Sequence, residues 1–141
     1  MDSISTLELT PQHWDIIYSD IAKQYPEEAC GLVAGKFLQT ILRAQLVFPV
    51  ENVLHSPVVF RMDPLAQLKV LEQIEEQNLL LIGIYHSHPQ GPDHPSEKDI
   101  SEAAYPDLVH LIFSRTQGDW HCRAFRINVT DFHEVNLQIT A

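Results

Sequence analysis

An unbroken apolar run at residues 79–85, LLLIGIY, constrains the fold of this chain more than any other feature. The run is far shorter than the roughly 20 residues that a membrane-spanning helix needs. A strand that is apolar at every position is typical of a strand buried on both faces. Other elements must then cover both faces, so we predict an α/β (α+β) fold with helices packed on a sheet.

Two helices have clear start signals, because Thr10-Pro11 and Asp63-Pro64 each place a capping side chain before a proline at the first helical position. The first helix should end before Pro26 and the second at Asn78. Apolar spacing predicts which side chains face inward. These are Trp14, Ile17, Tyr18, Ile21, Ala22 and Tyr25 in the first helix, and Leu65, Leu68, Leu71 and Ile74 in the second.

The remaining elements follow from turn residues and alternating apolar positions. Two strands joined by a tight turn at Gly35-Lys36 precede a loop over residues 50–57, and a proline-rich loop leads to a short helix from Ser96 to about Tyr105. The expected strands cover residues 30–35, 38–48, 108–114, 120–128 and 132–139. No linker or repeat interrupts the pattern, so we expect a single domain over residues 1–141.

Charge and cysteine content exclude several classes of function. Nine Lys and Arg face nineteen Asp and Glu, a net charge of −10. Without a basic cluster, neither nucleic acid nor an anionic membrane is an expected partner. Cys30 and Cys122 are too few for a disulfide framework, and residues 1–10 lack a signal-peptide pattern. We therefore expect a soluble cytoplasmic protein.

The apolar run continues directly into His86-Ser87-His88. In an extended segment, residues two apart point to the same face, so both imidazoles can converge on one point. Histidine is a common zinc ligand, and ligands gather beyond the carboxyl ends of strands in α/β sheets. The spacing alone is equally compatible with a metal site and with two solvated loop histidines.

Two acidic positions have both a structural and a chemical interpretation. Ser96 followed by Asp99 is typical of a capping box at a helix start, yet a carboxylate there also suits a third metal ligand. Glu28 belongs to an acidic pair, which usually forms a solvated surface. Beside a metal site, the same carboxylate can act as a general base.

Together, these five residues resemble the signature of the JAMM (MPN+, JAB) metalloprotease family. That signature is an upstream Glu, then His-x-His, seven residues, Ser, two residues and Asp, which maps onto Glu28, His86, His88, Ser96 and Asp99 without a gap. The short chain is similar to the stand-alone prokaryotic branch. Four further segments share the resemblance, namely residues 26–31, 60–64, 83–89 and 104–107.

The resemblance implies a cytidine-deaminase-like domain with a mixed sheet, and a role for each residue. His86, His88 and Asp99 would bind Zn²⁺, Glu28 would be the general base, and Ser96 would stabilise the oxyanion. The implied substrate is the C-terminal Gly-Gly tail of a ubiquitin-like or sulfur-carrier protein, cut at a peptide or an isopeptide bond. The alternative is a non-catalytic MPN-type scaffold with a structural zinc.

The other histidines and Cys30 are interpreted as structural or surface residues. The remaining histidines have no partner at ligand spacing and are treated as structural or surface residues, with His94 singled out because its loop lies between the ligands. Cys30 is interpreted as a small buried residue rather than a nucleophile. A flexible tail is expected to add a strand to a sheet edge near residues 50–57 and 58–61. The remaining histidines are His13, His55, His94, His110, His121 and His133.

Overall fold

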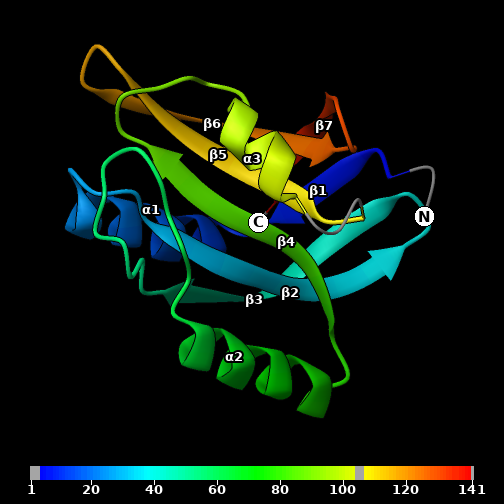
Figure 1. Ribbon diagram of the computed structural model, residues 1–141. Coiled ribbons are helices and arrows are strands. Elements are labelled where there is room, and N and C mark those ends of the chain that lie inside the picture. Colours follow the sequence, from blue (N-terminus) through cyan, green and yellow to red (C-terminus); the bar gives the residue numbers. More distant parts are fainter. Residues whose placement is uncertain (1–3, 104–106, 141) are drawn as a thin grey trace.

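The predicted buried strand, residues 79–85, coincides with the first part of β4 (Leu80–His88), which lies in the centre of the sheet (Figure 1). The computed structural model describes residues 4–103 and 107–140. Burial sets in at Ile82, whereas Leu80 at the start of the strand is 51% exposed. The other elements are β1 (Thr6–Leu9), α1 (Pro11–Gln24), β2 (Cys30–Leu38), β3 (Ile41–Val50), α2 (Pro64–Glu76), α3 (Glu97–Glu102), β5 (Val109–Thr116), β6 (Asp119–Ile127) and β7 (Phe132–Ile139).

The sheet is mixed, as expected, and it closes into a barrel in the order β1-β3-β2-β4-β5-β6-β7. β1 pairs in parallel with both β3 and β7, and β4 pairs in parallel with β5, while the other neighbours are antiparallel. Two apolar clusters lie on opposite faces of this wall. Ile17 and Ile21 of α1 belong to the larger cluster, and Ala66 and Val70 of α2 pack on the smaller one. Helices therefore cover both faces of the central strands.

Helix α1 begins and ends where the sequence predicts. The Thr10 side chain accepts a hydrogen bond from the His13 backbone N–H, and Tyr25 caps the helix before Pro26. The predicted inward stripe is too wide, because Tyr18 and Tyr25 are 41% and 43% exposed and Ala22 is exposed as well. The curved barrel wall touches only a narrow line of side chains, which runs through Trp14, Ile17 and Ile21.

Helix α2 also has its predicted ends, but its inward face is not the leucine face. Asp63 caps the helix by accepting from the Ala66 N–H, and Asn78 adopts φ of 57° beyond its last turn. Of the four predicted inward residues, only Ile74 is buried. Leu65, Leu68 and Leu71 are exposed, because the helix rests on the sheet through residues spaced four apart, Ala66, Val70 and Ile74.

The hairpin between β2 and β3 turns four residues later than predicted, at Gln39-Thr40. Gly35 serves a different purpose, since the register of β2 against β3 shifts between Ala34 and Gly35. A Cβ atom at Gly35 would clash with the backbone oxygen of Arg43. The glycine therefore permits a close backbone approach at a bulge.

Two further differences concern short elements. The sequence patterns gave no sign of β1, and α3 ends at Glu102 with Ala103 as its cap, earlier than expected. Tyr105, where that helix was expected to end, lies outside the described residues, as do 104 and 106. Among the helices described, none combines the length and apolar character needed to cross a membrane.

Candidate metal centre

The two histidines at the end of β4 point to the same face and meet at their ring nitrogens. The Nε2 atoms of His86 and His88 lie 2.9 Å apart, and both side chains are buried. Burial lowers the pKa of His86, which keeps its imidazole neutral. The alternation expected of an extended segment is thus present, and the imidazoles are not solvated loop groups.

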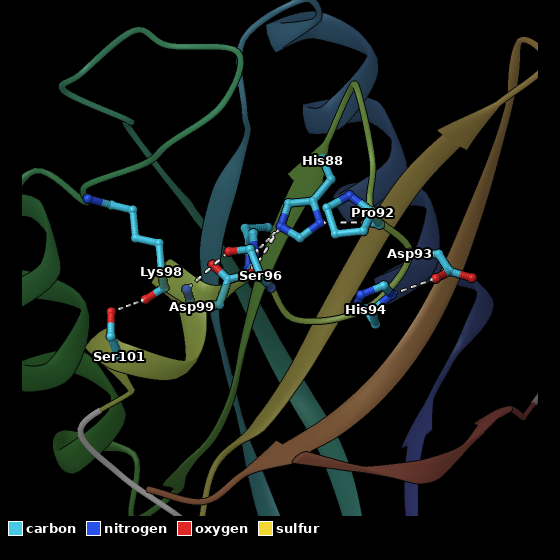
Figure 2. A network of polar contacts seen from close by, with 9 residues as sticks. His88, Pro92, Asp93, His94, Ser96, Lys98, Asp99 and Ser101 are labelled. Atoms are coloured by element: carbon cyan, nitrogen blue, oxygen red, sulfur yellow. Dashed lines mark hydrogen bonds and ion pairs between the residues drawn. The ribbon is translucent and has the colours of Figure 1, made fainter. Parts of the chain in front are cut away.

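Asp99 reaches the same point from the first turn of α3. Its Oδ2 atom lies 3.2 Å from His86 Nε2. The same atom lies 3.1 Å from His88 Nε2 (Figure 2). Burial alone would raise the pKa of the Asp99 carboxyl, but the interactions with His86 and His88 outweigh burial and hold this pKa well below its ordinary value. The carboxylate therefore stays charged between the two rings.

The donor atoms of this cluster fit a metal ion. Ligands about 2.0–2.1 Å from a tetrahedral ion lie about 3.3 Å from one another. The three separations among His86, His88 and Asp99 are between 2.9 and 3.2 Å. Ligand atoms of Glu28, His86 and His88 also lie within 4.8 Å of one another. The described residues can therefore hold a metal ion through the two histidines with Asp99 or Glu28.

Glu28 lies between α1 and β2 and is only 3% exposed. Its backbone is fixed on both sides, because its N–H donates to the Ser56 carbonyl at 2.8 Å and its carbonyl accepts from Asn52 Nδ2 at 3.0 Å. Burial raises the pKa of the Glu28 carboxyl to about 8, with His88 opposing this rise and Asp99 adding to it. A carboxyl group with such a pKa can accept and release a proton near neutral pH.

Ser96 and Asp99 form a reciprocal capping box at the start of α3. The Asp99 N–H donates to Ser96 Oγ at 3.1 Å, and the Ser96 N–H donates to Asp99 Oδ2 at 2.9 Å. The structural interpretation of this pair is therefore confirmed, and it is compatible with the chemical one. The hydroxyl of Ser96 accepts in the cap, so its own proton is still available to a ligand.

Backbone and ring contacts orient both imidazoles. His88 Nδ1 lies 2.7 Å from the Pro92 carbonyl oxygen, which places the proton on Nδ1 and the lone pair on Nε2 (Figure 2). His86 stacks on Phe60 with ring centroids 4.6 Å apart. The His86 Nδ1 atom is buried and has no hydrogen-bond partner in the described part of the chain.

Sequence reasoning missed two residues that hold the site together. Ser87, between the histidines, points to the opposite face, where its Oγ accepts from the Ala29 N–H at 2.8 Å. Asn52 bridges the Glu28 and Val59 carbonyls through its Nδ2 atom. Ser87 therefore connects the strand of the histidines to the segment that carries Glu28. The alternation of β4 was the signal that its side chain faces away from His86 and His88.

A cavity of about 490 Å³ opens beside the cluster. His110 of β5 lines it, although the sequence pattern marked this residue only as structural or surface. Burial lowers the pKa of His110 to about 4. The cavity is lined by Glu28, Val58, Val59, Phe60, Arg61, Met62, Pro64, Gln67, Ile84, His86, Ser96, Lys98, Asp99, Glu102, Ala103, Leu108 and His110.

His94 and Cys30 do not join the cluster. His94 is exposed, lies 3.0 Å from Asp93 and stacks on Phe132 of β7. Cys30 is fully buried beneath α2, and burial raises the pKa of its thiol to about 12. The interpretation of Cys30 as a small buried residue is confirmed.

Comparisons with known proteins agree with this geometry. The chain is 40% identical over 110 residues to a desampylase of Pyrococcus furiosus. This match spans 78% of this chain and 75% of the relative. It is 42% identical over 94 residues to a probable TtuB-protein conjugate cleaving protease of Thermus thermophilus, 66% of this chain and 60% of the relative. It is 33% identical over 106 residues to a CysO-cysteine peptidase of Mycobacterium tuberculosis, 74% and 71% of the two chains.

Solved structures share the fold as well. A protein of Desulfitobacterium hafniense, known from a solution structure, superposes with a TM-score of 0.85 at 29% identity over 95% of this chain and 92% of its own. The sequence profile of the prokaryotic homologues of the JAB domain matches residues 10–128. This match includes all five residues of the signature. The chain belongs to the family of prokaryotic homologues of the JAB domain.

Proposed function

We propose that this protein is a zinc-dependent peptidase that cuts after the C-terminal Gly-Gly tail of a ubiquitin-like or sulfur-carrier protein. The observation that carries this proposal is the buried Glu28 carboxyl beside the cluster of His86, His88 and Asp99, at one end of a cavity. Residues 1–141 act in this proposal as a single peptidase domain. The two cysteines, which are both free, support a cytoplasmic location.

In this proposal His86, His88 and Asp99 are the zinc ligands. Asp99 Oδ2 lies within 3.2 Å of both imidazole nitrogens, closer than the 4.8 Å that bounds the group with Glu28. Two neutral ligands and one anion leave a fourth position open, which is typical of catalytic zinc. Bound zinc supplies a Lewis acid that lowers the pKa of water toward about 7 and polarises a carbonyl group.

Glu28 and Ser96 do the remaining chemistry. Glu28 takes a proton from the attacking water and delivers it to the nitrogen of the leaving amine, a use that its raised pKa supports. The Ser96 hydroxyl donates to the scissile carbonyl oxygen as negative charge develops there. The capping contact with the Asp99 N–H holds this hydroxyl beside the cluster.

The extended segment of residues 58–61 is the proposed docking edge for the tail. All four residues line the cavity. Among the described residues, the N–H groups of Val59 and Phe60 and the carbonyls of Val58 and Phe60 have no hydrogen-bond partner. An extended tail can pair with these free groups as an added strand. The names of the relatives, which refer to a CysO-cysteine peptidase and a protein-conjugate protease, support this substrate class.

Variants of Glu28 and His88 test the mechanism. Glu28→Gln should retain zinc and lose turnover by at least about 100-fold, the lower bound of a typical general-base contribution. His88→Ala should lose both zinc and turnover, because it removes a ligand. His133→Ala, at an exposed position on β7, should keep both. Zinc content by mass spectrometry and tail cleavage by intact mass give the two readouts.

The outcome also separates the enzyme from a scaffold. Full activity of Glu28→Gln would refute the proposed mechanism. Bound zinc without cleavage of any ubiquitin-like or sulfur-carrier tail by the unmodified protein would favour a scaffold with a structural metal.

A further inference from the structure

The cavity beside the metal cluster is larger than the proposed tail requires. Its volume of about 490 Å³ lies within the range of roughly 300–1,000 Å³ of small-molecule sites. The two glycines that precede the scissile bond have no side chains to fill it. The part of the substrate that follows the bond, the leaving group, can therefore occupy the space that a tail docked along residues 58–61 leaves free.

His110 is a polar side chain in this cavity to which the described part of the chain offers no hydrogen-bond partner. It is 8% exposed, and β5 places it beside Ile84 of β4, two residues before the first histidine of the cluster. None of the described residues forms a hydrogen bond with its ring. A buried polar group without a partner is costly, whereas an imidazole in any protonation state offers at least one N–H donor. This donor is available to a ligand.

The charges of the lining indicate which ligand group fits. Outside the metal cluster and Glu28, the charged lining residues are Arg61, Lys98 and Glu102. Lys98 Nζ lies 3.2 Å from Glu102 Oε1, so these two charges compensate each other. Arg61 has no ion-pair partner in the part of the chain that the structure describes. The lining thus adds an uncompensated cation to the free donor of His110, and both favour a carboxylate.

We propose that His110, together with Arg61, binds the free α-carboxylate of the amino acid that leaves. The inference rests on the proposed peptidase function and adds a preference to it. A single amino acid attached by a peptide bond after the tail carries such a carboxylate. The lysine side chain of an isopeptide presents methylene groups to the cavity instead. His110 therefore makes the enzyme favour the peptide-linked amino acid.

Matched substrates test this preference. A sulfur-carrier protein extended past Gly-Gly by cysteine is prepared with a free C-terminal carboxylate and as the carboxamide, so that the thiol is common to both. The unmodified enzyme should cleave the acid with a kcat/KM about tenfold or more above that of the amide, in keeping with a charge-assisted hydrogen bond. The difference should lie mainly in KM.

Variants then assign the preference to its residues. His110→Leu should remove the preference by raising KM for the acid alone, His110→Gln should restore part of it through its amide N–H, and Arg61→Gln should weaken it. The controls are His133→Leu and Lys69→Gln, both at exposed positions outside the cavity. Zinc content and melting temperature show whether each variant is folded and loaded.

Binding to the inactive Glu28→Gln protein gives a readout that needs no turnover. The peptide Gly-Gly-Cys should bind more tightly as the acid than as the amide, and His110→Leu in that background should abolish the difference. Equal cleavage and equal binding of acid and amide would overturn the role of His110 and leave the peptidase intact. Tighter binding of the acid without any cleavage would support the carboxylate site and contradict the proposed function.

Discussion

The carboxyl group of Glu28 is buried, and burial of a charged group is unfavourable. Its carboxyl group is 3% exposed and faces Asp99, so both burial and a like charge disfavour its ionised form. No lysine or arginine in the described chain forms an ion pair with it. The Glu28 side chain is therefore expected to lower stability wherever it must be ionised, in exchange for its proposed role as a base.

This expectation gives a pH-dependent prediction for the metal-free protein. The folded pKa of Glu28, about 8, exceeds its ordinary value of 4.5. The stability that the protonated carboxyl contributes is thus fully present below pH 4.5 and is lost as the pH rises through about 8. Glu28→Gln should match the unmodified chain near pH 4.5 and exceed its free energy of unfolding at pH 9.

Chelator-treated samples of both proteins, unfolded with urea at each pH, would measure this difference. An equal difference in the free energy of unfolding at both pH values would contradict the burial of an ionisable Glu28.

Ser87 contributes both to stability and to the position of Glu28. Its Oγ accepts the buried Ala29 N–H, next to Glu28 in the chain. Ser87→Ala should lower the free energy of unfolding by about 1–3 kcal/mol, because this N–H loses its partner. It should also reduce kcat through displacement of Glu28. Ser101→Ala removes an exposed contact to the Lys98 carbonyl and should change stability by less than about 0.5 kcal/mol.

At the scale of elements, local signals predicted where helices begin and end but not which side they bury. The caps at Thr10 and Asp63 involve residues within a few positions of each other, so the sequence contains all that determines them. The buried side of α2 depends on how the helix lies on the sheet. Its alanine, valine and isoleucine positions contact the sheet, although the apolar spacing predicted that its leucines would do so.

The rotation of α2 can be checked with a pair of substitutions. Ile74→Ala should lower the free energy of unfolding by about 2–5 kcal/mol, as expected for a buried side chain. Leu68→Gln should change it by less than about 0.5 kcal/mol, since Leu68 is 53% exposed and glutamine favours helices. Chemical denaturation of both variants compares them directly, and a larger loss at Leu68 would contradict the observed face.

At the scale of the whole molecule, closure of the barrel was not predictable from the sequence. β1 has only four residues and pairs with β3 and β7, which are distant in the chain. No local periodicity reports such pairing. The five proposed site residues could be selected because the family signature fixes their order and the spacing of the last four. Their supports, such as Ser87 and Asn52, act across separate segments and left no such signal.

The importance of β1 can be tested through Leu7, which is fully buried in the larger core cluster. Leu7→Ala should lower the free energy of unfolding by about 2–5 kcal/mol. Val129→Ala, at a position that is 91% exposed, is the control and should have almost no effect. A negligible loss at Leu7 would mean that β1 does not contribute to the closed sheet.

The proposed function requires that the buried cluster at the end of β4 cuts a protein tail after Gly-Gly. Intact-mass analysis tests it most directly, with a sulfur-carrier protein extended by cysteine and a lysine-linked ubiquitin-like protein as substrates. We predict a product that ends at Gly-Gly, absent after addition of a chelator and restored by zinc. Unchanged masses of both substrates with the zinc-loaded protein, or cleavage that persists in the chelator, would contradict this function.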